Sequence, residues 1–227
     1  MVILRFALLR TFRNPIPIIA SLVLPIGLLS LSGLWGDANS RGYYFIALVI
    51  LFLSFPLTGL ITSDRRERTI VRIMTTPTTT LSYLTQNFIA CMIPLLIQIT
   101  VVGILGMWWR DWDLEFAFFL CLCYAIFAAT SIAFAFAWSC LFKNREVSFT
   151  VLLMVLTFSA FAGILLPLDF LPTVLRYLFM IFPTFWVSSG IEELIDNGVT
   201  FRLILCLIVL VIFVIVFLAD GSKRGAY

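Results

Sequence analysis

Residues 63–80, SDRRERTIVRIMTTPTTT, form the most polar stretch of a chain that is 62% hydrophobic and only 12% charged. The stretch holds four arginines and two acidic residues, and it separates two apolar runs that are each long enough to cross a bilayer. Soluble domains have about 25% charged residues. The composition therefore predicts a membrane protein.

The apolar runs define the expected architecture. A helix of about 20 apolar residues crosses a hydrocarbon core of about 30 Å. We therefore expect an all-α membrane protein, residues 1–227 forming one transmembrane domain with six transmembrane helices, at about 16–35, 43–62, 86–109, 116–140, 148–168 and 201–219. Within residues 1–14, Arg5, Arg10 and Arg13 lie among leucines and phenylalanines. This pattern favours a helix on the membrane surface over a cleaved signal peptide.

The positive charges predict the orientation. With the N-terminus in the cytoplasm, 11 of the 15 Lys and Arg residues fall in cytoplasmic segments, and the outer segments keep Arg41, Arg110, Arg176 and Arg202. The positive-inside rule then predicts that both termini are cytoplasmic.

Residues 169–198 do not fit a seventh span. They are apolar in the middle but are broken by Pro172 and Pro183, and they carry Arg176. A seventh span would move Lys223 and Arg224 to the outside. We expect instead a pair of short helices that enter the outer leaflet and return, covered by neighbouring spans. Trp186 is expected at the headgroup level.

Several classes of chemistry have no support in the sequence. There is no histidine and no G-x-x-x-x-G-K-[ST] phosphate-binding loop. No basic face suits nucleic acid. No ionisable residue lies near the middle of a run, which disfavours ion-coupled transport.

The polar residues at depth are expected to serve mostly helix packing and backbone hydrogen bonding, with substrate contact less favoured; they are Gln98, Thr100, Thr130, Ser131, Ser139, Thr157 and Ser159. The four alanines Ala125, Ala129, Ala133 and Ala137 form a close-packing face, within the chain or between subunits.

The opening stretch predicts a short helix at residues 64–76. Ile70, Ile73 and Met74 share one face, the arginines take other directions, and Thr76-Pro77 ends the helix. From these residues alone, two interpretations remain. The stretch is an arginine-rich loop that sets topology, or it is a helix presented to a soluble partner.

Two segments carry a resemblance to a known family. SDRRERTIVRIMTTPTTTLSYLTQNFIA, residues 63–90, is similar to the loop after the second span of ABC type-2 exporter permeases. GILLPLDFLPTVLRYLFMIFPTFWVSSGIEEL, residues 163–194, resembles the end of that family's fifth span and the helices that follow it. Arg68 stands where the family usually has Gly.

The resemblance implies one half of a transporter, paired in the membrane lipid with a second copy of this chain or with a related permease, that works with two ATP-binding cassette subunits. ATP and Mg would bind to those subunits, and this chain would hold no cofactor or metal. Residues 64–76 would be the coupling helix that contacts the ATPase, through Glu67, Thr69, Ile70, Ile73 and Met74. The helix with Arg5, Arg10 and Arg13 would lie at the interface beside it. The outer pair would form a gate carrying Pro167, Pro172, Arg176 and Pro183.

The expected function is that of a permease without its own nucleotide site. It would export an amphipathic compound, such as an antimicrobial peptide or a drug, through a bacterial plasma membrane. Export of a lipid-linked glycan is the alternative within this class. An ion-coupled carrier, a channel, a membrane scaffold or an enzyme are the alternatives outside it.

Overall fold

The computed structural model describes residues 2–13, 15–35, 41–66, 80–141, 154–157, 159 and 177–224. Over these residues the chain is helical and contains no strand. The elements are α1 (Val2–Arg13), α2 (Pro15–Ser30), the 3₁₀ helix η1 (Ser32–Leu34), α3 (Arg41–Arg66), α5 (Thr80–Trp109), α6 (Leu114–Leu141), α9 (Pro183–Asn197) and α10 (Phe201–Arg224).

Four described helices are long and apolar enough to cross a membrane: α3, α5, α6 and α10. They coincide with four of the six predicted spans. A fifth crossing results if α1 and α2, which are bent by 69° relative to each other, count as one broken span. The predicted span at 16–35 corresponds to α2 and η1. The predicted span at 148–168 falls almost wholly outside the described residues, of which 154–157 and 159 are helical.

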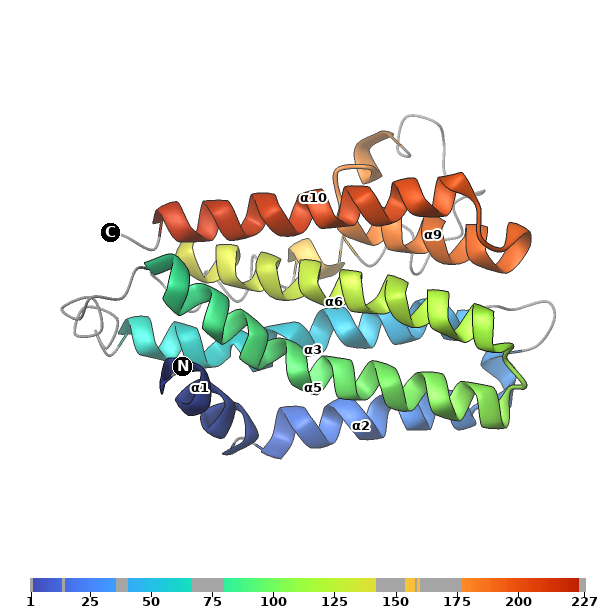
Figure 1. The fold of residues 1–227 in the computed structure, drawn as a ribbon, viewed down its shortest axis with the longest axis horizontal. Helices are drawn as coiled ribbons and strands as arrows, with labels where there is room; N and C mark the ends of the chain where they lie inside the picture. The colour runs from blue at the N-terminus through green and yellow to red at the C-terminus, as the bar shows by residue number, and fades with distance from the viewer. Residues whose placement is uncertain are drawn as a thin grey trace.

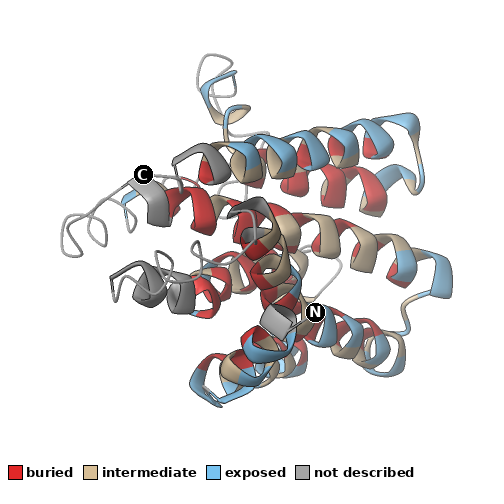
Figure 2. Cartoon of the chain, turned by 60° about the vertical axis from the view of Figure 1, so that its left-hand side comes forward, coloured by how far each residue is buried: buried red, intermediate tan, exposed pale blue. Residues whose placement is uncertain are grey.

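Helix α6 is the centre of the bundle. It packs against α3, α5, α9 and α10, and its Tyr124, Phe127 and Phe136 are fully buried. A helix that is apolar on all sides either packs among other helices or faces lipid. The membrane-crossing part of α6 is 56% buried, against 17% for α10. Helix α10 is therefore peripheral and turns a broad apolar face outward (Figure 2).

Small residues bring α6 and α10 close together. A Cβ on Gly221 would lie 3.7 Å from the backbone N and Cα of Ala137. The Thr130 hydroxyl lies 2.9 Å from the carbonyl oxygen of Ile126 and 3.3 Å from that of Leu210. Small residues allow such close approach in lipid. Ala133 and Ala137 are both buried, so this part of the alanine face packs within the chain.

An aromatic end cluster joins α2, α3, α5 and α6 at one end of the bundle; it consists of Trp35, Tyr43, Arg110, Trp112 and Phe116. The ring centroids of Trp35 and Tyr43 are 4.9 Å apart, and those of Tyr43 and Trp112 are 5.4 Å apart. Arg110 lies over the Trp35 ring at 5.5 Å and donates a 2.7 Å hydrogen bond to the Leu29 carbonyl. It thereby caps the carboxyl end of α2, where a cation is favourable.

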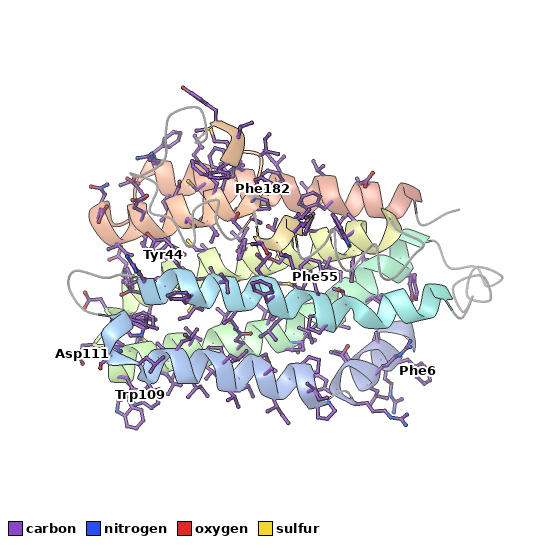
Figure 3. All side chains as sticks on the ribbon, turned by 180° about the vertical axis from the view of Figure 1, so that it is seen from behind. Phe6, Tyr44, Phe55, Trp109, Asp111 and Phe182 are labelled. Carbon is purple, nitrogen blue, oxygen red and sulfur yellow. The ribbon has the colours of Figure 1, made fainter. Side chains whose placement is uncertain are left out.

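The opposite end carries α1. Figure 3 shows Trp109 and Asp111 at one end of the bundle and Phe6 at the other. The end of α3, the start of α5 and the end of α10 lie at the α1 end (Figure 1). We refer to these as the aromatic end and the α1 end.

Replacing Gly106 tests the aromatic end cluster. A Cβ at Gly106 would overlap the ring of Trp112, which its aromatic neighbours hold in place. We expect Gly106→Ala to destabilise the protein by about 1–3 kcal/mol, as overpacking does. The control is Gly27→Ala, since no atom lies within 4 Å of its Cβ position. Thermal unfolding in detergent measures both; equal melting temperatures would contradict the close contact.

Candidate functional site

Helices α3 and α5 extend beyond the apolar part of the bundle at the α1 end. The apolar runs are 43–62 in α3 and 86–109 in α5, whereas the helices run to Arg66 and from Thr80. At 1.5 Å per residue, the extensions measure about 6 Å and about 9 Å. The two helices form a stalk that carries residues 67–79. The predicted coupling residues lie outside the described residues; they are Glu67, Thr69, Ile70, Ile73 and Met74.

Helix α1 packs beside this stalk. It contacts α5 and α3, with Ala7 and Thr11 buried. Phe6, Leu9 and Phe12 are exposed, as are Arg5 and Arg13, while Arg10 is half-buried. The three predicted arginines therefore share one helix whose exposed surface mixes aromatic and cationic side chains. Such a surface suits the boundary between headgroups and acyl chains.

The predicted gate is described in part. Of its four residues, Pro183 lies in the described region, and Pro167, Pro172 and Arg176 lie outside it. Pro183 is the first residue of α9, where its missing N–H has no cost, and the extended Phe182 precedes it. Helix α9 then packs along α10, to which it is joined through Gly198 with φ of 70°. A positive φ of this kind favours glycine.

Side chains fix the first turn of α9. The hydroxyls of Ser159 and Thr184 lie 3.0 Å apart in a buried hydrogen bond, which ties the predicted fifth span to α9. The Trp186 indole Nε1 donates to the Met180 carbonyl at 2.8 Å. The N–H of Trp186 thus holds the turn that leads into α9, and the expected position of Trp186 at the headgroup level stays a prediction.

A buried carboxylate holds the other end of α9. Glu193 is 8% exposed. Its Oε1 accepts hydrogen bonds from Asn197 at 3.2 Å and Thr200 at 2.9 Å, and its Oε2 lies 3.4 Å from an Arg202 nitrogen. The Arg202 side chain is 63% exposed. Solvent screens that ion pair, so the two hydrogen bonds to a buried anion contribute more to stability. This site was not predicted from the sequence. The polar spacing E-x-x-x-N-x-x-T, residues 193–200, is the pattern that could have indicated it.

Most polar side chains within the spans bond to their own helices. Thr100, Thr130 and Ser131 each donate to the carbonyl four residues earlier. Gln98 differs, because it is 1% exposed and neither of its amide atoms has a partner among the described residues. In the same part of the chain, no group of three or more His, Cys, Asp or Glu side chains could hold a metal ion.

Glu193 variants test how α9 is fixed to α10. Glu193→Ala leaves buried donors without an acceptor, and we expect a loss of about 1–3 kcal/mol of stability. Glu193→Gln keeps one acceptor oxygen and should lose less. Arg202→Ala is the matched control, with an expected loss of about 0–1 kcal/mol. The melting temperatures rank the three; an Arg202→Ala effect as large as that of Glu193→Ala would show that the ion pair dominates.

Comparison with known proteins places the fold in a family. Curated protein sequences gave no match. A family model described as "ABC-2 family transporter protein" matches residues 17–220, which include nearly all of the bundle from α2 to α10. On that match, the chain belongs to the ABC-2 transporter family and is the membrane permease component of an ABC transporter.

Proposed function

We propose that this permease exports an amphipathic compound, working as a dimer with two ATP-binding cassette subunits. The family implies an ATPase partner. The cargo proposed is an antimicrobial peptide, a drug or a similar compound with apolar and polar parts. Nucleotide and Mg would bind to the ATPase subunits.

The stalk formed by α3 and α5 is the observation that carries this proposal. Both helices continue past the apolar runs, so a force applied at residues 67–79 would act on both spans directly. The predicted coupling helix at 64–76 begins within the last turn of α3. Ile70, Ile73 and Met74 would enter a groove on the ATPase, with α1 beside the contact.

The charges of the described spans favour an amphipathic cargo over an ion. Within the membrane-crossing windows, Asp, Glu, Lys and Arg residues lie only near the ends; they are Arg41, Glu115, Arg202 and Asp220. Ion-coupled transporters keep ionisable groups at depth, where each is costly. A route without such groups suits a cargo that brings its own apolar surface.

The distribution of cations favours a cytoplasmic α1 end. Helix α1, the end of α3 and the end of α10 carry seven of them: Arg5, Arg10, Arg13, Arg65, Arg66, Lys223 and Arg224. The described segments at the aromatic end carry Arg41, Arg110 and Arg202. By the positive-inside rule, the α1 end would face the cytoplasm of a bacterial cell, and the α9–α10 turn would face outward.

Substitutions in the coupling segment test the contact with the ATPase. Ile73→Asp or Met74→Asp would bury an unpaired charge at the interface, at a cost of about 2–5 kcal/mol. We expect more than about tenfold weaker association, seen as loss of ATPase co-purification and of cargo-stimulated ATP hydrolysis. Thr75→Asp adds the same charge on another face and should retain both. If the Ile73→Asp permease still binds and stimulates its ATPase, this segment is not the coupling helix.

Labelling of introduced cysteines tests the orientation. Asp196, in the last turn of α9, is exposed, and Lys143 follows the fourth predicted span. In intact cells, a membrane-impermeant maleimide should label Asp196→Cys, and it should label Lys143→Cys only after permeabilisation. The parent chain supplies the background from its five native cysteines. Labelling of both variants from one side would exclude the re-entrant arrangement of residues 169–198.

A further inference from the structure

A cavity of about 270 Å³ lies between α3, α6, α10 and the start of α9. Its walls include Leu51 of α3, Phe134 of α6, and Phe213 and Phe217 of α10. Ile181, Phe182 and Pro183 close it on the α9 side, and Val155 and Ser159 line it from the predicted fifth span. Figure 3 shows Phe182 between the two ends of the bundle.

The cavity lies deep in the membrane-crossing part of the bundle. Helix α9 has 15 residues, so Pro183 is about 22 Å from the turn that joins α9 to α10. Phe213 is twelve residues after Phe201, the start of α10, which corresponds to about 18 Å. A hydrocarbon core is about 30 Å thick. Pro183 and Phe213 therefore lie well away from the turn between α9 and α10, within the length of the apolar helices.

The chemistry of the walls excludes water as a stable occupant. Phe134, Phe213 and Phe217 form a continuous aromatic wall, with centroids 5.3 Å and 5.7 Å apart. The cavity has two hydroxyls, and both are already bonded: Ser131 to the Phe127 carbonyl at 2.9 Å, and Ser159 to Thr184 at 3.0 Å. A buried water needs two to four polar partners, whereas an apolar cavity of about 150 Å³ stays dry and binds benzene. This cavity accommodates a longer hydrocarbon.

The cavity reaches the surface of the bundle beside Ile181. That residue lines the cavity and is also 67% exposed. Met154, next to the lining residue Val155, is 63% exposed and does not line the cavity. An apolar wall that reaches the outer surface at this depth gives access to acyl chains and to no polar molecule.

We propose that this cavity holds one acyl chain of a bilayer lipid, inserted past Ile181 against Phe182 and Pro183. The chain fills the space behind the first turn of α9, so a lipid supports the α9–α10 hairpin from within one protomer. The cavity includes Pro183 of the predicted gate, but its lipid occupant can be detected without cargo and without the ATPase. Its experiment therefore needs neither transport nor ATP.

Photolabelling with a lipid tests the site. The purified permease is placed in nanodiscs of phosphatidylethanolamine and phosphatidylglycerol, doped with a phosphatidylethanolamine that carries a mid-chain diazirine. Mass spectrometry then locates the attached lipid. We expect label on Ser131, which is 2% exposed and which lipid outside the bundle cannot reach. A probe with its diazirine in the headgroup should leave Ser131 unlabelled.

Neighbouring residues supply matched variants. Val155→Phe fills the cavity and should abolish the Ser131 label, whereas Met154→Phe, whose side chain lies outside it, should retain the label. Phe217→Ala enlarges the cavity and should increase the label, which keeps the test valid if Val155→Phe does not fold. Size-exclusion chromatography identifies folded variants. An unlabelled Ser131 in the parent, or equal label in folded Val155→Phe and parent, overturns the proposal. Labelling of Ser131 by a free fatty acid that carries a diazirine, but not by the phospholipid, also overturns the proposal.

Discussion

The fold depends on one constraint: in hydrocarbon, every backbone N–H and C=O must find a partner inside the protein. Long helices meet it along most of the chain. The start of α9 is the exception, because the backbone breaks there at depth. The break is stable because Ile181 and Phe182 donate to carbonyls three residues earlier, Phe185 donates to Phe182, and the Trp186 indole takes the Met180 carbonyl. Pro183 has no N–H to satisfy. The backbone groups at the start of α9 are thus satisfied by local hydrogen bonds.

Hydropathy predicted where helices cross but not where they end. The run at 43–62 lies within α3, Arg41–Arg66, and the run at 86–109 lies within α5, Thr80–Trp109. Hydropathy measures the cost of transferring side chains into lipid, whereas a helix continues as long as its backbone bonds are favourable. The stalk consists of residues that continue the helix although their side chains are too polar to favour transfer into lipid. The bend between α1 and α2 was likewise expected only as the boundary of a surface helix.

Local structure at the candidate site could be predicted where the signal was local, whereas the roles assigned to its residues stay predictions. Pro183 is visible as a helix start, and Arg5, Arg10 and Arg13 are visible as a cationic helix. The contacts that fix the elements join distant positions: Ser159 to Thr184 across 25 residues, and Arg110 to Leu29 across 81. No periodicity reports such pairs, because they depend on which helices pack together. The assignments of Glu67, Thr69, Ile70, Ile73 and Met74 stay predictions.

The aromatic end cluster makes the bundle unequally stiff along its length. Arg110 caps α2 at Leu29, and the Tyr124 hydroxyl donates to the Tyr43 carbonyl at 2.8 Å, so α2, α3, α5 and α6 are tied together at this end. If α2 tilts about the aromatic end, the displacement of its residues grows with their distance from that end. For α2, the far end is the 69° junction with α1. Because α1 packs against α5 and α3, a tilt of α2 about the aromatic end would shift α1 along those two helices.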